Sequence, residues 1–235
     1  MTSQMYINNA LLATYRSWAE AVCAPVFWRM SNGRMNNGTI TFLRTASTVL
    51  GLTNKHVAEG LINSDDRGWQ LGNAQFDPNR IIARHPDLDL ATYQLSDVFL
   101  SAAGKDAATV TTWPPQRPAM NQPIALGGYP GMYRKVIGPN VSFGFAWFAG
   151  NVTVEGDATI GIVLNLDESI ATTSERIPAH ADLGGSSGGP VFRVVESNGI
   201  ERLELAAIID QCSSASETVL ARPLTSLAVD GTFVN

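Results

Sequence analysis

Two kinds of hydrophobic pattern divide the chain of 235 residues. The first is helical, with apolar residues near the N-terminus at Leu11, Leu12, Tyr15, Trp18, Ala19 and Val22. Asn8 or Asn9 can cap a helix there, so the spacing predicts one amphipathic helix that ends before Pro25. Because its polar face carries few basic residues, we expect this helix to pack on the body of the domain rather than on a membrane.

After Pro25 the pattern changes to short apolar or β-branched runs separated by Gly, Asn, Asp and Pro. Many short strands of this kind are typical of an all-β sandwich or barrel. The predicted strands are Val26–Met30, Thr39–Arg44, Thr48–Thr53, Ile81–Arg84, Ala91–Leu95, Ile124–Leu126, Val141–Phe148, Gly161–Asn165, Val191–Val195 and Leu203–Ile209.

The stretch Thr111–Pro123 contains four prolines, which cannot donate ladder hydrogen bonds, so it predicts a connector between two halves. We expect a helix in residues 1–24, a first β unit in residues 25–112, a linker in residues 113–123 and a second β unit in residues 124–235. A short helix is predicted over Pro223–Val229.

Composition excludes several classes of protein. Hydrophobic residues make up 45% of the chain and charged residues 16%, which excludes a disordered chain. The net charge is −5 and no Lys/Arg run is long enough to bind phosphates, so we expect no nucleic-acid partner. We expect no membrane partner and a cytoplasmic location, because no long apolar segment or secretion signal is present. Cys23 and Cys212 can form one bridge, but two free thiols are the simpler interpretation.

The strongest candidate for chemistry is the turn Gly184–Pro190, which reads GGSSGGP. Glycines allow backbone conformations closed to other residues, so Ser187 can present its hydroxyl while neighbouring N–H groups point into the same space. A serine hydroxyl needs a base, and His56 follows an apolar run that places it at the end of a strand. Asp89, between two leucines, is the carboxylate that can orient this base. We expect His85 and His180 to lie on the surface.

The order His56, Asp89, Ser187 excludes two other hydrolase classes. An esterase or lipase of the α/β-hydrolase fold requires a histidine after the serine, and none follows Ser187. The subtilisin order requires Asp before His, which leaves only His85 with Asp65 or Asp66 and no supporting motif.

With these positions the chain resembles the trypsin/chymotrypsin-like serine peptidases, and among them the bacterial HtrA-type and glutamyl-endopeptidase-like branches. The resemblance covers roughly residues 25 to 225 and rests on five segments. Leu52–Val57 resembles the family's L-T-x-x-H-V element, Asp89–Ala91 its D-[IL]-A element and Gly185–Phe192 its G-x-S-G-G-P element. Gly38–Leu43 is similar to a first-barrel strand, and Gly127–Gly131 to a second-barrel G-Y/F-P segment.

The resemblance implies two six-stranded antiparallel barrels of the chymotrypsin type, with His56 and Asp89 on the first and Ser187 on the second. It also implies an oxyanion hole made by the N–H groups of Gly185 and Ser187. Ser186 stands where digestive enzymes have an Asp that pairs with a new N-terminus, so we expect activation without such a cleavage. We expect no PDZ domain after the second barrel, and an activating protein partner is left open.

The resemblance places the specificity pocket between the segment before the nucleophile and the strand Ala207–Ser213. The expected substrate-binding residues are Ala181, Asp182, Asp210, Gln211 and Cys212. Ala181, six residues before the nucleophile, disfavours a basic P1 residue, although Asp182 is adjacent to it. His180 would favour an acidic P1 residue. Asp210, Gln211 and Cys212 are unusual on such a pocket wall, and the sequence gives none of them a more specific role than lining it.

No cofactor or metal is expected, because the cysteines and histidines lack zinc-site spacing and no Walker motif occurs. The sequence therefore predicts a serine endopeptidase that cleaves protein or peptide substrates through an acyl-enzyme. The alternative is a scaffold that keeps these residues and binds a protein partner.

Overall fold

The computed structural model describes residues 9–64, 69–71, 73–138, 140–171, 177–178, 181–213 and 217–234, and its fold is mostly β. The helical elements are α1 (Asn9–Ala21), α2 (Lys55–Ile62), α3 (Asp97–Ala103) and the 3₁₀ turn η1 (Gly131–Tyr133). The strands are β1 (Cys23–Arg29), β2 (Met35–Arg44), β3 (Val49–Asn54), β4 (Trp69–Leu71), β5 (Ala74–Phe76), β6 (Ile81–Arg84), β7 (Leu90–Leu95), β8 (Pro123–Gly128), β9 (Arg134–Ile137), β10 (Asn140–Phe143), β11 (Ala146–Glu155), β12 (Ile160–Ala171), β13 (Pro190–Ser197), β14 (Ile200–Ser213) and β15 (Thr218–Pro223).

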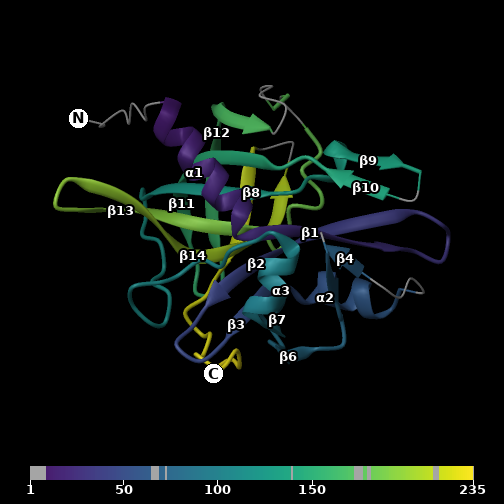
Figure 1. Cartoon of the computed structure of the whole chain (residues 1–235). Coiled ribbons are helices and arrows are strands. Elements are labelled where there is room, and N and C mark those ends of the chain that lie inside the picture. The colour runs from purple at the N-terminus through teal and green to yellow at the C-terminus, as the bar shows by residue number, and fades with distance from the viewer. Residues whose placement is uncertain are drawn as a thin grey trace.

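The second half of the chain forms a closed barrel of six strands in the order β11-β12-β15-β14-β13-β8 (Figure 1). Every neighbouring pair is antiparallel. Alternate residues of β15 are buried, which is the period expected when one face of a strand looks into a core. That core contains Phe148, Ile162, Val191 and Ile209, all at most 1% exposed.

The first half forms an antiparallel sheet in the order β1-β2-β3-β7-β6. Its described residues contribute five strands to this sheet rather than the six that were predicted, and β4 and β5 pair separately. Phe42, Tyr93 and Leu61 are buried in a core of their own beneath it. The predicted fold class is confirmed: the protein is an all-β, chymotrypsin-like pair of β units with few helices.

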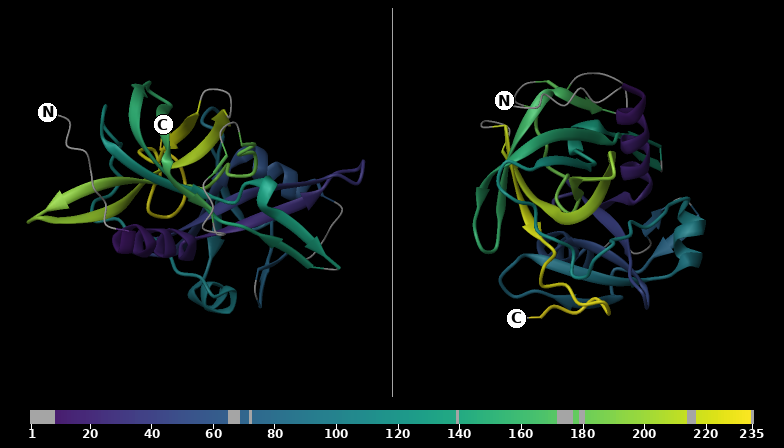
Figure 2. Two further views of the ribbon diagram at one scale, coloured as in Figure 1. Left: turned by 90° about the horizontal axis from the view of Figure 1, so that it is seen from above. Right: turned by 90° about the vertical axis from the view of Figure 1, so that its left-hand side faces the viewer.

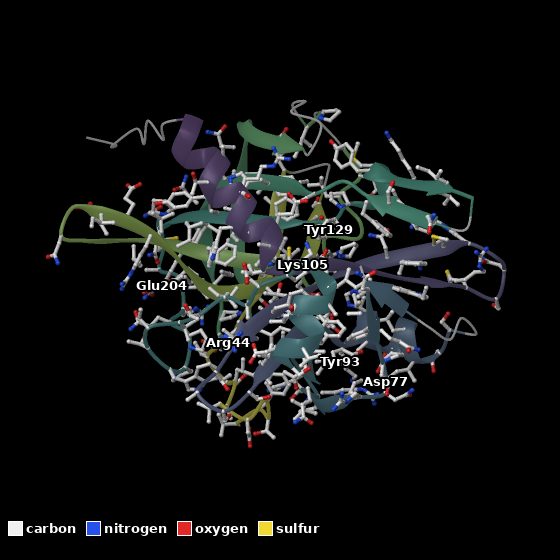
Figure 3. All side chains as sticks on the ribbon, viewed as in Figure 1. Arg44, Asp77, Tyr93, Lys105, Tyr129 and Glu204 are labelled. Carbon is white, nitrogen blue, oxygen red and sulfur yellow. The ribbon has the colours of Figure 1, made fainter. Side chains whose placement is uncertain are left out.

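Helix α1 packs on the body of the protein, as predicted (Figure 2). The ring of Trp18 lies 4.9 Å from that of Phe192 in the second barrel, and Ala19 and Val22 are buried. Lys105, after α3, donates to the Glu20 carbonyl and to the Tyr129 hydroxyl, which joins the helix to both halves (Figure 3).

The predicted C-terminal helix over Pro223–Val229 is wrong. In the described residues 217–234 the chain leaves β15 in turns, and Leu227 forms a bridge with Phe233. The spacing of Leu224 and Leu227 suggested a helix, but both enter the hydrophobic core from a segment of turns, the last of which ends at Gly231 with φ 90°. This segment crosses from the second barrel to the first sheet, where the Gly231 carbonyl accepts a hydrogen bond from Thr92 Oγ1 (Figure 2).

Candidate active site

Strand β3 and helix α2 position His56. β3 lies between β2 and β7, all six of its residues are buried, and Asn54 occupies the N-cap position of the helix that begins at the next residue. Val57 and Leu61 anchor α2 in the core. His56 is the second residue of this helix, and its side chain is 52% exposed. A rigid, buried strand therefore presents an accessible imidazole.

Asp89 holds His56 at two points. Its Oδ2 lies 2.6 Å from Nδ1 of the imidazole, and its Oδ1 accepts a hydrogen bond of 3.0 Å from the backbone N–H of His56. The Asp89 carbonyl accepts a third, from Lys55 N–H, at 2.9 Å. Asp89 makes these contacts from a left-handed backbone conformation, with φ 51°, which Asp tolerates better than most residues. The arrangement fixes the tilt of the ring and leaves Nε2 on the side away from Asp89.

The contact between His56 and Asp89 shifts the pKa of each residue. Burial alone would lower the pKa of His56, but the hydrogen bond and charge of Asp89 outweigh it and raise that pKa. Burial would raise the pKa of Asp89, but the hydrogen bonds and charge of His56 lower it overall. Asp89 thus stays ionised while His56 changes charge, which is the division of roles that a histidine base needs.

Ser187 lies in a turn clamped between the two halves. The N–H of Thr39 on β2 donates to the Ser187 carbonyl at 2.8 Å, and the N–H of Gly188 donates to the Ile209 carbonyl on β14 at 2.8 Å. Gly188 has φ 86°, and a Cβ there would lie 2.0 Å from the Thr39 carbonyl oxygen, so only glycine fits. The Ser187 hydroxyl donates to the Asp210 carbonyl at 2.9 Å, not to His56.

The predicted oxyanion donors, the N–H groups of Gly185 and Ser187, lie in a turn whose backbone hydrogen bonds fix the Gly184–Gly185 peptide. Ser186 N–H donates to the Leu183 carbonyl and Gly185 has φ 99°, as in a turn that requires glycine at its third position. The Gly184 carbonyl accepts from Gly131 N–H at 2.7 Å, so the N–H of Gly185 points the opposite way across a trans peptide. Within the described part of the chain, the N–H groups of Gly185 and Ser187 have no hydrogen-bond partner.

Residues 39–198 match the family model of the trypsin-like peptidase domain. The chain belongs to the trypsin-like peptidase family. No curated protein matches it significantly.

Two solved structures show the same fold at low identity. The serine endoprotease from Yersinia pestis is 16% identical with a TM-score of 0.54, over 90% of this chain and 62% of its own. This chain thus spans less than two thirds of that endoprotease. A Glu endopeptidase is 14% identical with a TM-score of 0.50, over 88% of this chain and 86% of its own.

In this trypsin-like peptidase the predicted pocket residues have different surroundings. Ala181 is buried in the core of the second barrel, whereas Asp182 is exposed and its Oδ1 accepts the N–H of Gly184 at 2.9 Å. Gln211 is exposed, and Cys212 packs against the barrel core. Their role in binding substrate stays a prediction.

The sequence contains two other histidines, His85 and His180. His180 lies outside the described residues. His85 was expected on the surface, but it is buried: its ring meets that of Phe233 at 5.4 Å, and its Nδ1 accepts the N–H groups of Asp87 and Leu88. The C-terminal turn covers it, which no pattern near residue 85 reveals.

Asp210 is the member of the site that sequence reasoning left without a role. Its carboxylate, the carboxylate of Asp89 and an imidazole nitrogen of His56 lie within 4.8 Å of one another. Three such groups can in principle bind a metal ion. However, Arg222 forms an ion pair of 2.8 Å with Asp210, and Asp89 engages Nδ1 of His56. A guanidinium at this position opposes a second cation, so we assign the cluster to ion pairing and hydrogen bonding.

Proposed function

We propose that this trypsin-like peptidase is a serine endopeptidase in which Ser187 is the nucleophile, His56 the general base and Asp89 the group that orients the base. The observation that supports this most is the two-point contact between His56 and Asp89, which leaves Nε2 of the ring available. An exposed imidazole with an ionised partner can accept a proton and keep it during a reaction.

The reaction begins when the Ser187 hydroxyl turns from the Asp210 carbonyl toward Nε2 of His56. His56 takes its proton while Oγ attacks the carbonyl carbon of a peptide bond. The N–H groups of Gly185 and Ser187 hold the resulting oxyanion. His56 then gives the proton to the departing amine, which leaves an acyl-enzyme. Water, deprotonated by His56, attacks the ester, and the Ser187 hydroxyl is restored with release of the carboxylic acid.

The test compares two adjacent serines. Ser186 is fully buried, and its hydroxyl has no hydrogen-bond partner in the described part of the chain, so Ser186→Ala is the matched control for Ser187→Ala. We expect a fluorophosphonate probe to label the wild type and Ser186→Ala but not Ser187→Ala. On casein or a peptide ester, Ser187→Ala should lose activity by a factor on the order of 10⁴ or more.

Two results would contradict the proposal. Wild-type activity in Ser187→Ala would exclude Ser187 as nucleophile. A folded wild type that neither reacts with the probe nor cleaves any member of a proteome-derived peptide library would favour the partner-binding scaffold.

A further inference from the structure

Asp210 occupies an irregular position in the second barrel. Ile209 pairs with Ala221 on β15 and Gln211 with Leu220, so Asp210 is the extra residue of a β-bulge. A bulge bends a strand and changes the direction of a side chain, and bulges are frequent beside active sites. Here the bulge sends the Asp210 side chain to Arg222, which pairs with it at 2.8 Å. Their side chains are 13% and 20% exposed, so this is a largely buried ion pair.

The same residue contacts both parts of the candidate triad. Its carbonyl accepts the Ser187 hydroxyl at 2.9 Å. Its carboxylate lies in the group of atoms within 4.8 Å that includes Asp89 and the imidazole of His56. Asp210 therefore meets the nucleophile through its backbone carbonyl and the base through its carboxylate.

We propose that Asp210 is a positioning residue that acts on the catalytic centre through His56, as a second anion beside Asp89, and that Arg222 moderates its charge. The inference rests on the proposed function, because the protonation state of His56 affects the reaction rate only if His56 is the general base. In this role Asp210 acts through the charge it places beside His56 and not by transferring a proton itself.

Two carboxyl groups this close do not ionise independently. Burial, followed by the neighbouring Asp89, raises the pKa of Asp210, while Arg222 opposes this rise. The pKa of Asp89 is lowered, so Asp89 ionises first as pH rises and Asp210 after it. His56 then loses its proton while both carboxylates face it. Among the described residues, the charge of Glu59 on α2 also raises the pKa of His56, and the charges of Asp182 and Asp210 act on Cys212 of β14.

Two variants that replace a charged side chain by a neutral amide should shift the pKa of His56 in opposite directions. Asp210→Asn removes an anion, so His56 should release its proton at lower pH. Arg222→Gln leaves the Asp210 charge without its partner, so His56 should hold its proton to higher pH. Coulomb's law for unit charges within 4.8 Å of each other gives a shift for Asp210→Asn of about 0.6 pH units in bulk water and about 2.5 pH units at an effective dielectric constant of about 20. We expect a smaller shift for Arg222→Gln, because Arg222 pairs with Asp210 and acts on His56 through it.

The measurement is made twice on each variant of the full chain. The first readout is the acid midpoint of kcat/KM against pH with a peptide ester. The second is the titration of the His56 imidazole followed by NMR and assigned with a His56→Ala sample. Asp87→Asn removes the same charge from an exposed turn two residues from Asp89 and should leave both midpoints within error. If Arg222→Gln does not fold, the double variant Asp210→Asn/Arg222→Gln replaces it, because it leaves no unpaired buried charge. The acid midpoint of the double variant should lie below that of the wild type, because the anion nearer to His56 is removed.

Opposite shifts in Asp210→Asn and Arg222→Gln support the inference. An unmoved His56 in Asp210→Asn, or shifts of the same sign in both variants, would overturn it. The NMR titration does not require enzymatic activity. An inactive protein would therefore contradict the proposed function, and the pKa of His56 measured by NMR would still show whether Asp210 acts on His56.

Discussion

The N–H of Gly131 donates to the carbonyl of Gly184 at 2.7 Å, and this bond sets the direction of the next peptide N–H, that of Gly185. Gly131 begins η1 of the second barrel, far in sequence from the serine turn. If the Gly184 carbonyl were free, the peptide could rotate and aim its oxygen where an oxyanion must sit. The bond therefore prepares one of the two proposed donors before substrate arrives.

The first prediction is that Gly131→Pro lowers kcat about 10- to 100-fold with a smaller change in KM. Proline has no N–H, so the Gly184 carbonyl loses its partner and the Gly185 donor loses its fixed direction. Gly131→Ala keeps the N–H and is the control. Its Cβ would lie 3.0 Å from Asn37 Oδ1 and 3.3 Å from the Gly184 oxygen, which asks for a small adjustment only. Equal losses in the two variants would argue that volume, not the hydrogen bond, is responsible.

The second prediction concerns Asp89→Asn. Asn tolerates the left-handed conformation that Asp89 adopts, so the backbone of the turn should be retained. Asp89 raises the pKa of His56 against the effect of burial, so its loss should move the acid limb of the rate profile to lower pH. The sign follows because activity is present above the pKa of the base and lost below it. We expect kcat to fall by about 10³ to 10⁴ as well.

The contrast with Asp210→Asn makes this prediction specific. Both variants should shift the acid limb downward, but only Asp89→Asn removes the group that holds the ring. A pH–rate profile of Asp89→Asn that keeps the wild-type kcat would show that the contact with Nδ1 does not support catalysis.

Sequence patterns predicted those strands and helices whose bounds are marked by neighbouring residues. Ile81–Arg84 was predicted with the bounds that β6 has, because its apolar run ends at charged and turn residues. The predicted strand Val141–Phe148 is instead two strands: β10 pairs with β9 in a separate two-stranded sheet, and β11 belongs to the closed barrel. Helix α2 was missed, although the buried Val57, Ala58 and Leu61 have helical spacing.

The site was predictable only as far as its motifs extend. His56 and Asp89 stand in short recognisable segments, and the fold brings Nδ1 of His56 to 2.6 Å from Oδ2 of Asp89. Asp210 has no motif: its surroundings come from a bulge in the pairing of β14 with β15 and from Arg222 across that ladder. Such a relationship depends on strand register, which a single sequence does not reveal at this distance along the chain.

The third prediction is that neither cysteine reacts readily in the native protein. Both cysteines are free, as expected. Cys23 is fully buried, its Sγ donates to the Ala19 carbonyl, and burial raises its pKa to about 12. Burial, with the charges of Asp182 and Asp210, also raises the pKa of Cys212 to about 12. Since the thiolate is the reactive form, alkylation by iodoacetamide at mildly alkaline pH should be about a thousandfold slower than for a free cysteine.

Mass spectrometry before and after unfolding in guanidinium checks this prediction. Two added groups should appear only in the unfolded sample. Rapid native modification of Cys212, which is only partly buried, would mean that its thiol ionises more readily than its surroundings suggest.

The fourth prediction concerns Glu204 on β14, labelled in Figure 3. Its side chain is 7% exposed, and it binds Arg193 at 2.6 Å, Arg202 at 2.8 Å and the Thr111 hydroxyl at 2.6 Å. Thr111 belongs to the proline-rich connector, so Glu204 ties the connector to the second barrel. Glu204→Gln leaves the largely buried Arg193 without its ion-pair partner and should lower the free energy of unfolding by about 3 kcal/mol.

The pH dependence of this loss gives the sharper test. Burial opposes ionisation of Glu204, but Thr111 and the two arginines outweigh it and lower its pKa. Its contribution is therefore present above the pKa of the unfolded chain and is lost as pH falls through the lower folded-state value. Urea unfolding should show the deficit of Glu204→Gln at neutral pH and a shrinking difference in acid. Glu196→Gln, at an exposed position on the neighbouring β13, should change stability by less than about 0.5 kcal/mol. A deficit that stays constant into acid would mean that the charge of Glu204 does not stabilise the barrel.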